Sequence, residues 1–342
     1  MAQVAKILTG KGIETLTVGD APIPQPGPGQ ALVRLHAATL NFRDLIMAKG
    51  LIPGIAKEPD LVPLSCASGE VIAVGDGVTR VKPGDRVTPT FTQGWISGPQ
   101  LSMDMLGGLI DGVARQYANF PAESLCHLPD ELGDLEGATL ACAALTSWSA
   151  LTQFRQLAAG DWLLTHGTGG VSIAALQMAK AMGANVIITS SSDAKLLRAK
   201  ALGADVTINY RSTPDWADAI RKVLGGRKIA NVIDTVGAAQ FDDNVSVLAE
   251  DGQLSAIGML GSDFSWTRQE SEVNLAAVAV GNRDQHEAMV RFIVEHKIRP
   301  VVDIVYDLGR IQDAYRTLES GRFFGKVGVN LLCGETWPAP VD

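Results

Sequence analysis

The feature that most constrains the fold is a regular alternation of strand-like and helix-like segments over residues 161–256. Short apolar runs such as NVIITS alternate with longer stretches such as VSIAALQMAKAMG, whose apolar residues recur every three or four positions. Several helical stretches end in glycine, as at Gly183 and Gly203, which is a common way for a helix to stop. Strands that alternate with helices in this way predict a parallel sheet with helices on both faces.

The segments on either side of this alternation have a different character. About the first 125 residues contain short strand-like runs separated by turns rich in proline and glycine, such as PIPQPGPG at 22–29. The closing stretch 301–332 again mixes two strands with one helix, so we expect it to rejoin the front section. The chain therefore predicts an α/β protein with a divided first domain, 1–128 plus 284–342, and a second domain at 129–283.

Composition excludes several classes of protein. The net charge of −8 comes without a block of lysine and arginine, which argues against nucleic acid as a partner. No apolar run approaches the roughly 20 residues of a membrane helix, and the N-terminus does not resemble a signal peptide, so we expect a cytoplasmic protein. The four cysteines (Cys66, Cys126, Cys142 and Cys333) form no CxxC pair, so we expect neither a disulfide framework nor a cysteine-rich zinc site.

A glycine-rich segment, THGTGGVS at 165–172, lies directly between a predicted strand and a predicted helix. Glycine allows a tight turn there and lets the backbone approach a pyrophosphate, whose charge is met by the helix N-terminus. Ordinary loop glycines are the alternative, but the position within a βαβ unit favours dinucleotide binding. The predicted pyrophosphate-binding residues are Gly167, Thr168, Gly169, Gly170 and Val171.

The residues after the next strand indicate which dinucleotide is bound. Many NAD enzymes place Asp or Glu here for the ribose 2′-hydroxyl, whereas this chain has Ser190, Ser191 and Ser192, followed by Asp193 and Lys195. Hydroxyls and an ammonium favour a 2′-phosphate. The serines also suit the cap of the following helix, with Asp193 in its first turn and facing away from the ribose, and the two roles are compatible. We therefore predict NADP(H), bound by Ser190, Ser191 and Lys195.

A series of motifs runs in order through nearly the whole chain. They are LNFRD at 40–44, GEV at 69–71, VKPGDRV at 81–87, ATLACAALTSWSAL at 138–151, the glycine loop, GAD at 203–205 and FGKV at 324–327. Together they resemble the medium-chain dehydrogenase/reductase superfamily, in particular its zinc-independent quinone oxidoreductase-like and enoyl reductase-like members. The resemblance implies a GroES-like β domain, a doubly wound Rossmann domain and a homodimer. An apolar strand expected at 273–281, at the sheet edge, also favours pairing with a second subunit.

The resemblance also bears on metal binding. Zinc-dependent alcohol dehydrogenases of this superfamily hold their catalytic metal with a Cys, a His and a second Cys or Asp. This chain has Asn41 and Ser65 at the first two positions, and only Cys142 matches. A catalytic zinc needs three protein ligands, and a rearranged site built from Cys66 and Cys142 lacks a third. The segment 93–111 lacks the cysteines of a structural zinc, so we predict no metal.

Without zinc to polarise a carbonyl, hydride transfer requires an acceptor that is already electrophilic. We therefore predict a zinc-independent, NADPH-dependent oxidoreductase that reduces a quinone or an α,β-unsaturated carbonyl, with hydrogen bonds stabilising the developing oxygen anion. Two alternatives stay open. One is a zinc-independent NAD(P)-dependent alcohol dehydrogenase or carbonyl reductase, and the other is a non-catalytic NADPH-binding protein.

The substrate side of the predicted site consists of Asn41, Arg43 and Asp44. Asn41 is a candidate donor to a substrate or nicotinamide oxygen. Arg43 and Asp44 are expected to form an ion pair beneath it, which is compatible with a purely structural role. No proton donor stands out: His166, beside the glycine loop, is expected to orient the backbone, and solvent is the expected source of the proton.

The remaining predicted residues contact the cofactor. By resemblance, Thr146 packs against the nicotinamide, although a buried helical threonine is the plain alternative, and Tyr210 lies near the adenosine. Lys326 is expected at the cofactor phosphates or carboxamide, or else as an ordinary surface lysine. Because ligands of open α/β sheets lie at the carboxyl ends of strands, the ends of two later strands supply Gly258, Met259, Leu260, Gly281 and Arg283.

Overall fold

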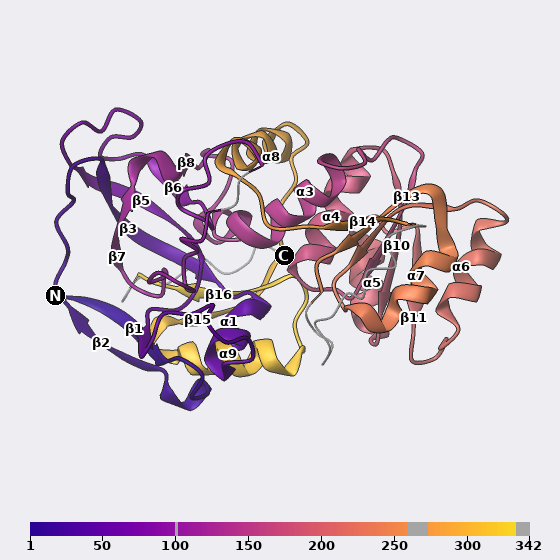
Figure 1. Cartoon of the computed structure of the whole chain (residues 1–342), viewed down its shortest axis with the longest axis horizontal. Coiled ribbons are helices and arrows are strands. Elements are labelled where there is room, and N and C mark those ends of the chain that lie inside the picture. The colour runs from indigo at the N-terminus through magenta and orange to yellow at the C-terminus, as the bar shows by residue number, and fades with distance from the viewer. Residues whose placement is uncertain (100–101, 259–272, 333–342) are drawn as a thin grey trace. The chain divides into compact units, whose positions relative to one another are not determined.

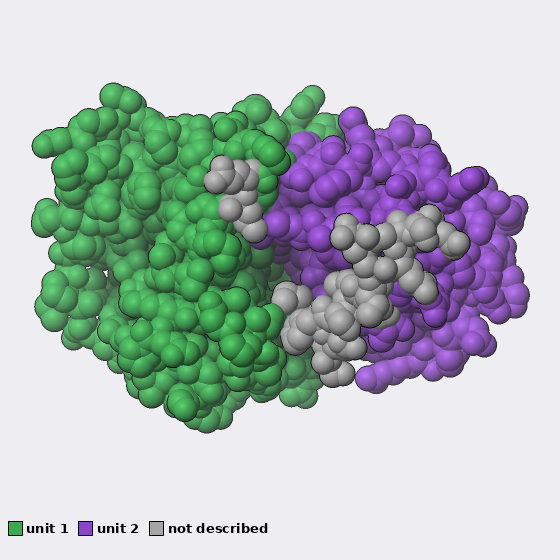
Figure 2. All heavy atoms as spheres, viewed as in Figure 1, with its two compact units in different colours: residues 1–142, 281–342 green, residues 143–280 purple. Residues whose placement is uncertain are grey.

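The computed structural model describes residues 1–99, 102–258 and 273–332. The chain divides into two compact units, which are coloured separately in Figure 2. Unit 1 comprises Met1–Cys142 and Gly281–Asp342, and unit 2 comprises Ala143–Val280. Within the described residues, no helix is long and apolar enough to cross a membrane.

Unit 1 contains two sheets. The larger has the strand order β15-β16-β3-β5-β6-β8, with β7 also paired to β3, and the smaller has the order β2-β1-β4. Neighbouring strands are antiparallel except for β15 and β16, which run parallel. The strands are β1 Ala2–Leu8, β2 Thr17–Ala21, β3 Gln30–Thr39, β4 Asp60–Leu61, β5 Cys66–Val74, β6 Arg86–Pro89, β7 Tyr117–Pro121, β8 Leu125–His127, β15 Val302–Asp307 and β16 Lys326–Asn330.

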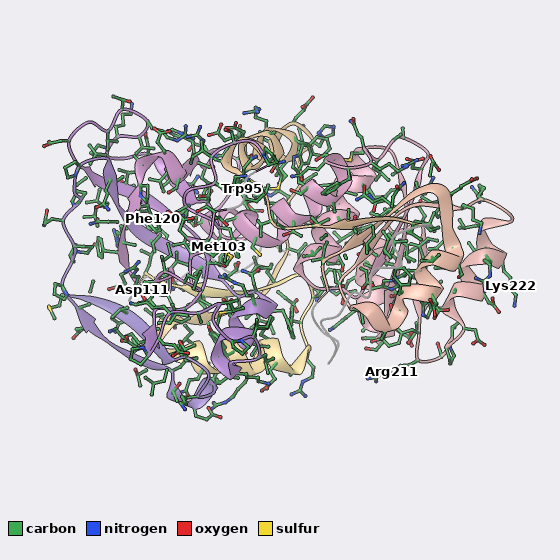
Figure 3. The ribbon with its side chains drawn as sticks, viewed as in Figure 1. Trp95, Met103, Asp111, Phe120, Arg211 and Lys222 are labelled. Carbon is green, nitrogen blue, oxygen red and sulfur yellow. The ribbon has the colours of Figure 1, made fainter. Side chains whose placement is uncertain are left out.

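The helices of unit 1 pack against these sheets (Figure 1). The α-helices are α1 Phe42–Lys49, α2 Asp134–Gly137, α8 Arg283–Glu295 and α9 Ile311–Ser320, and the 3-10 helices are η1 Ile13–Thr15, η2 Ala122–Ser124 and η5 Leu308–Arg310. The core joins alternate residues of β3, such as Val33 and Leu35, to Tyr315 of α9 and to Phe120 of β7, which is labelled in Figure 3. Burial of this apolar surface is the main stabilising contribution to this unit.

Unit 2 is a parallel six-stranded sheet in the order β11-β10-β9-β12-β13-β14. The strands are β9 Trp162–His166, β10 Asn185–Ser190, β11 Val206–Asn209, β12 Ile229–Asp234, β13 Leu248–Ala256 and β14 Asn274–Ala277. The helices are α3 Leu145–Thr152, α4 Gly170–Ala181, α5 Asp193–Ala201, α6 Trp216–Leu224 and α7 Phe241–Val247, with the 3-10 helix η4 Ala238–Gln240 and the π-helix η3 Leu140–Ala144, which leads in from unit 1.

The order of these strands reverses between β9 and β12, and this reversal fixes where a ligand can bind. α6 and α7 pack on the face of the sheet that carries Leu164, Ile187 and Val232. Right-handed crossovers then place α4 and α5, which contact β9, β10 and β11, on the opposite face. The predicted α/β class, a mixed sheet domain plus a doubly wound parallel sheet, is confirmed. In such sheets the ligand crevice lies at the carboxyl ends of the strands on either side of the reversal.

The units divide later in the sequence than the expected boundary at 128/129, because residues after 128 are bonded to the sheet of unit 1. The Ser68 hydroxyl donates to the carbonyl oxygen of Asp134 at 2.6 Å, and the Thr39 hydroxyl donates to that of Ala138 at 2.7 Å. The Asp134 carboxylate also contacts His36 and Arg86, at 2.9 and 2.8 Å. These contacts join α2 to β3, β5 and β6.

The strand predicted at 273–281 is shorter in the structure. β14 ends at Ala277 and forms the edge of the described sheet, as expected. Gly281 belongs to unit 1, and Arg283 is the first residue of α8, so the prediction that both end a strand is wrong. The reason is a helix cap: the Asn282 side chain accepts from the backbone N–H of Gln285 at 2.9 Å, and Gln285 accepts from that of Asn282 at 2.8 Å.

Candidate functional site

The glycine loop of unit 2 lies at the strand reversal. β9 is buried throughout, and three residues separate it from α4, whose N-cap is Gly169. Gly167 has φ of +75°, a left-handed conformation that favours glycine. A Cβ at Gly169 would meet no atom within 4 Å, and Gly169 offers no side-chain cap to α4. The first N–H groups of α4 therefore adjoin open space, which suits a pyrophosphate.

A network of buried hydrogen bonds around His166 holds the start of this loop in place. His166 is 2% exposed; its Nε2 lies 2.8 Å from Asn244 Oδ1, and its Nδ1 lies 3.0 Å from the hydroxyl of Thr189. Asn244 Nδ2 donates to Asp234 at 3.1 Å, so Asn244 Oδ1 is left to accept from Nε2–H of the imidazole. Burial lowers the pKa of His166, which keeps the ring neutral. The expected backbone-orienting role fits this contact set, because the Ser172 hydroxyl donates to the carbonyl oxygen of His166 at 2.6 Å.

The serines after β10 cap the following helix. Ser190 is the last residue of β10 and is buried, and its hydroxyl accepts from the backbone N–H of Ser192 at 3.3 Å. Ser192 is the N-cap of α5 and accepts from the backbone N–H of Lys195 at 3.4 Å. Asp193 lies in the first turn, and its carboxylate accepts from Asn209 at 2.7 Å. The Asp193 carboxylate is thus hydrogen-bonded to Asn209, the last residue of β11.

The segment after β11 adds two residues to this region. The backbone N–H of Tyr210 donates to the carbonyl oxygen of Ser190 at 3.1 Å, and its side chain is exposed. Arg211, next in the chain, is exposed at the surface of unit 2 (Figure 3). Arg211 was not among the predicted residues, although its place in the chain just after a strand end offered a signal. The backbone of Tyr210 therefore lies beside the end of β10, and Arg211 is the next residue in the chain.

The other predicted cofactor residues differ in their settings. Thr146 is buried in α3. A Cβ at Gly258 would lie 2.4 Å from backbone atoms of Thr235 and Val236, so glycine is required where the segments after β12 and β13 meet. Met259 and Leu260 lie outside the described residues. The Arg283 guanidinium is bound to Glu123 of unit 1 at 2.6 Å.

A second cluster, in unit 1, gathers around Asn41, the N-cap of α1. The Asn41 side chain has three hydrogen-bond partners outside α1. Its Nδ2 donates to Ser65 Oγ at 3.2 Å and to Cys66 Sγ at 3.1 Å. Its Oδ1 accepts from Lys326 Nζ at 2.6 Å, and Lys326 also donates to the carbonyl oxygen of Leu40. We call Asn41, Ser65, Cys66, Cys142 and Lys326 the Asn41 cluster.

These contacts change the expected roles of two residues. Both amide hydrogens of Asn41 are used within the cluster, so in this arrangement Asn41 positions its neighbours rather than presenting a free donor. Lys326 is only 5% exposed, so the alternative of an ordinary surface lysine is wrong. Its ammonium was predicted to contact the cofactor phosphates or carboxamide. In the structure it is hydrogen-bonded to the Asn41 side chain.

The two cysteines of the cluster are electrostatically unequal. Burial raises the pKa of the Cys66 thiol, but the hydrogen bond with Cys142, the charge of Lys326 and the hydrogen bonds from Asn41 and Ser65 together lower it to about 6. The hydrogen bond with Cys66, together with burial, raises the pKa of Cys142 well above its usual value. Cys66 is therefore the more acidic thiol of the two.

The prediction of an ion pair between Arg43 and Asp44 is wrong: among the described residues, the two side chains have other partners. The Arg43 guanidinium lies over the ring of Phe91, 4.3 Å from its centroid, and donates to the carbonyl oxygen of Leu106. The Asp44 carboxylate instead accepts from the backbone N–H of Asn41 at 2.7 Å. Burial raises the pKa of Asp44 to about 6, although the charge of Arg43 and this hydrogen bond oppose the shift. Asp44 thus secures the start of α1.

The donor set of the Asn41 cluster does not fit a catalytic zinc. Such a site needs three thiolate, imidazole or carboxylate ligands. The cluster has two thiols, an amide, a hydroxyl and an ammonium, and the described residues contain no group of three His, Cys, Asp or Glu side chains suited to a metal. The positive charge in this cluster is the ammonium of Lys326, which donates to Leu40 and Asn41.

The low pKa of Cys66 yields a stability prediction. Because the folded pKa is depressed from 9.0 to about 6, the thiolate stabilises the fold fully above the unfolded pKa, and this contribution is lost as the pH falls through about 6. We expect the difference in free energy of unfolding between wild type and Cys66→Ser to grow from about pH 7 to about pH 9. Denaturant titrations at each pH measure it, with Cys126→Ser as the control. A constant difference would contradict a Cys66 thiolate.

Comparisons with known proteins agree with this description. Residues 27–130 match the alcohol dehydrogenase GroES-like domain family, and residues 170–295 match the zinc-binding dehydrogenase family. A zinc-type alcohol dehydrogenase-like protein of Schizosaccharomyces pombe is 38% identical over 92% of this chain and 95% of its own length.

Solved structures match over the same extent. An NAD-dependent alcohol dehydrogenase has a TM-score of 0.85 and 33% identity, covering 96% of this chain and 99% of its own. The quinone oxidoreductase of Pseudomonas syringae pv. Tomato has a TM-score of 0.82 and 29% identity, covering 96% of this chain and 100% of its own. The mixed sheet unit, the parallel sheet unit with its glycine loop and these matches lead to one conclusion: the chain belongs to the medium-chain dehydrogenase/reductase superfamily of oxidoreductases, which bind a nicotinamide cofactor.

Proposed function

We propose that this protein is a zinc-independent, NADPH-dependent reductase whose small-molecule substrate is a quinone or an α,β-unsaturated carbonyl. The observation that carries the proposal is the Asn41 cluster, in which a buried ammonium is bonded to Asn41 and the side chains do not form a set of zinc ligands. A cluster without a Lewis-acidic metal favours acceptors that are already electrophilic. Hydrogen bonds to the acceptor oxygen then stabilise the charge that develops on it.

The chemistry requires a hydride, an oxygen-stabilising group and a proton. A bound nicotinamide supplies the hydride. As it is transferred, negative charge grows on the acceptor oxygen, and Lys326 is the group we assign to meet it. An ammonium has three N–H donors; two serve Leu40 and Asn41, and the third is the donor for the oxygen. Asn41 holds the ammonium in place, and solvent supplies the proton.

Absence of zinc is part of the proposal and has a direct test. Elemental analysis of the purified protein, after exchange into metal-free buffer, should find far less than one zinc per chain. Activity should be unchanged after incubation with a chelator. One zinc per chain would contradict the assignment of Lys326 as the only cation of the cluster.

The preference for NADPH rests on the end of β10, where Ser190 and Ser191 precede Lys195 and where Asp193 is bonded to Asn209. Tyr210 and Arg211 follow β11, beside the carbonyl of Ser190, and Arg211 adds a cation to this region. An ammonium and hydroxyls stabilise a 2′-phosphate through charge-assisted hydrogen bonds.

Lys195→Ala should weaken NADPH binding by about tenfold, which corresponds to about 1.4 kcal/mol, and leave NADH binding nearly unchanged. The reason is that only NADPH carries the 2′-phosphate. Fluorescence titration with each nucleotide measures the two affinities. Lys200→Ala is the matched control, since Lys200 also lies on α5 but donates to the carbonyl oxygen of Asp205. Equal losses for both nucleotides would argue against the phosphate role.

A second candidate function is a zinc-independent alcohol dehydrogenase or carbonyl reductase, favoured by the names of several relatives, one of which is described as NAD-dependent. Assays of nicotinamide oxidation with a quinone, an enone and an aldehyde, and of its reduction with a primary alcohol, separate the candidates. Turnover of the alcohol but not the enone would overturn our choice. Tight NADPH binding without any turnover would favour a non-catalytic role.

We also propose a cytoplasmic homodimer paired through β14. β14 is the edge of the described parallel sheet, and an edge strand presents unpaired backbone N–H and C=O groups to a second copy. Sedimentation should give twice the chain mass, and Ala277→Pro, which removes a backbone donor on the outer edge of this strand, should shift the protein toward monomer.

A further inference from the structure

The imidazole of His166 joins three elements of unit 2 that meet at the glycine loop. His166 ends β9, Thr189 is the last residue but one of β10, and Asn244 lies in α7; all three side chains are buried. A neutral imidazole has one donor and one acceptor. Because Nε2–H donates to Asn244 Oδ1 at 2.8 Å, Nδ1 is left to accept from the Thr189 hydroxyl at 3.0 Å. The hydrogen bonds therefore form one continuous chain through the ring.

The far end of this chain is held by Asp234, the last residue of β12. One oxygen of its carboxylate accepts from Asn244 Nδ2 at 3.1 Å. The other oxygen accepts from the backbone N–H groups of Val236 and Gly237, at 2.7 and 2.9 Å. The ring of Trp216 in α6 packs edge-on against the imidazole, with the two centroids 5.0 Å apart. The imidazole is thus fixed by packing as well as by its hydrogen bonds.

Thr189 holds the start of the glycine loop by two bonds. Its hydroxyl donates to the imidazole of His166, and its carbonyl oxygen accepts from the backbone N–H of Gly167 at 2.8 Å. Ser190, the next residue, ends β10. In dinucleotide-binding sheets the glycine loop lies at the pyrophosphate, and the end of the next strand lies at the adenosine ribose. Thr189 therefore joins two places that one dinucleotide contacts at the same time.

We propose that Thr189, His166 and Asn244 are positioning residues for the nicotinamide dinucleotide, which hold the glycine loop in a fixed place relative to the end of β10. Their polar groups bond to one another and to Asp234, so they act through the backbone rather than by contact with the ligand. A preorganised loop raises affinity because binding does not also have to order it. Both NAD and NADP carry the pyrophosphate and the ribose, so this inference does not depend on the preference for NADPH proposed above.

The test removes the Thr189 hydroxyl from the full chain. Valine has the shape of threonine and suits a strand, so Thr189→Val should fold but lose the bond to the imidazole. NADPH and NADH should both bind about tenfold more weakly, equivalent to about 1.4 kcal/mol, and Thr189→Ser should restore the affinity. The matched control is Thr165→Val, since the Thr165 hydroxyl is buried on β9 and has no hydrogen-bond partner among the described residues. Fluorescence titration with each nucleotide measures the affinities.

The pattern of losses decides the outcome. Lys195→Ala is expected to weaken NADPH alone, whereas Thr189→Val should weaken both nucleotides by the same factor. Wild-type affinity for both nucleotides in folded Thr189→Val would overturn the proposal. A loss confined to NADPH, an equal loss in Thr165→Val, or a failure of Thr189→Ser to restore the affinity would also overturn it. Melting curves without nucleotide show that each variant is folded.

A double-mutant cycle tests whether the hydroxyl acts through the ring. His166→Phe retains an aromatic ring beside Trp216 but has no nitrogen to bond, so both nucleotides should bind at least tenfold more weakly. Adding Thr189→Val to His166→Phe should then cost little more, because the bond between the two side chains is already lost. Fully additive losses would contradict the proposed chain. If His166→Phe does not fold, the comparison of Thr189→Val with Thr189→Ser and Thr165→Val decides the matter.

Discussion

Gly169→Asp should weaken nicotinamide dinucleotide binding by about 100-fold or more while leaving the fold at least as stable as in the wild type. Gly169 has extended backbone angles, φ −82° and ψ −177°, that any residue adopts, and a Cβ there meets no atom within 4 Å. Aspartate is a preferred N-cap, so its carboxylate should accept from the first N–H groups of α4 and raise stability by a few tenths of a kcal/mol over glycine. That carboxylate would both occupy the donors that a pyrophosphate needs and repel its charge.

We expect the dissociation constant for NADPH to rise by about 100-fold or more, equivalent to about 2.8 kcal/mol. Fluorescence titration measures the affinity, and thermal unfolding without nucleotide measures the stability. Gly169→Ser is the matched control, because serine caps a helix equally well but carries no charge. Wild-type affinity in a folded Gly169→Asp protein would show that the pyrophosphate lies elsewhere.

Lys326→Met should lower kcat by about 100-fold, the loss expected when one donor to a developing oxygen anion is removed. Methionine retains much of the apolar length of the lysine but cannot donate to Leu40 or Asn41, and it leaves their buried oxygens without this partner. The cost to stability should be about 1–3 kcal/mol per unsatisfied group. Steady-state kinetics with an enone and denaturant unfolding measure the two effects.

A double-mutant cycle with Asn41→Ala separates positioning from general damage. If Asn41 acts by holding the ammonium, the second substitution should cost little once the first is made. NADPH affinity should stay near its wild-type value in Lys326→Met. A large loss of NADPH affinity with kcat preserved would return Lys326 to its predicted place at the cofactor phosphates.

Local patterns were sufficient to predict the architecture. The alternation over 161–256 determined the order of strands and helices in unit 2, because apolar periodicity is a property of short segments. The glycine loop could be placed between β9 and α4 for the same reason, and Asp193 in the first turn of α5. The prediction was less accurate near Asn282. A longer strand was expected there, but the Asn282 side chain caps the N-terminus of α8.

The Asn41 cluster depended on contacts between distant parts of the chain. Lys326 and Asn41 are 285 positions apart, and no local pattern joins them. The sequence indicated which zinc-ligand positions carry other residue types, but it could not show that the ammonium of a lysine from β16 is bonded to Asn41. Nor could it show that Arg43 would turn to Phe91 and Leu106, away from the neighbouring Asp44.

The sequence by itself therefore determined the two kinds of domain and the place of the glycine loop between β9 and α4, since each depends on residue type and short-range spacing. Only the tertiary structure decided which side chains share a buried environment. Burial makes an unpaired charge costly, so the ammonium of Lys326, the amide of Asn41 and the thiolate of Cys66 take their roles from one another. That mutual dependence exists only once β3, β5 and β16 have come together.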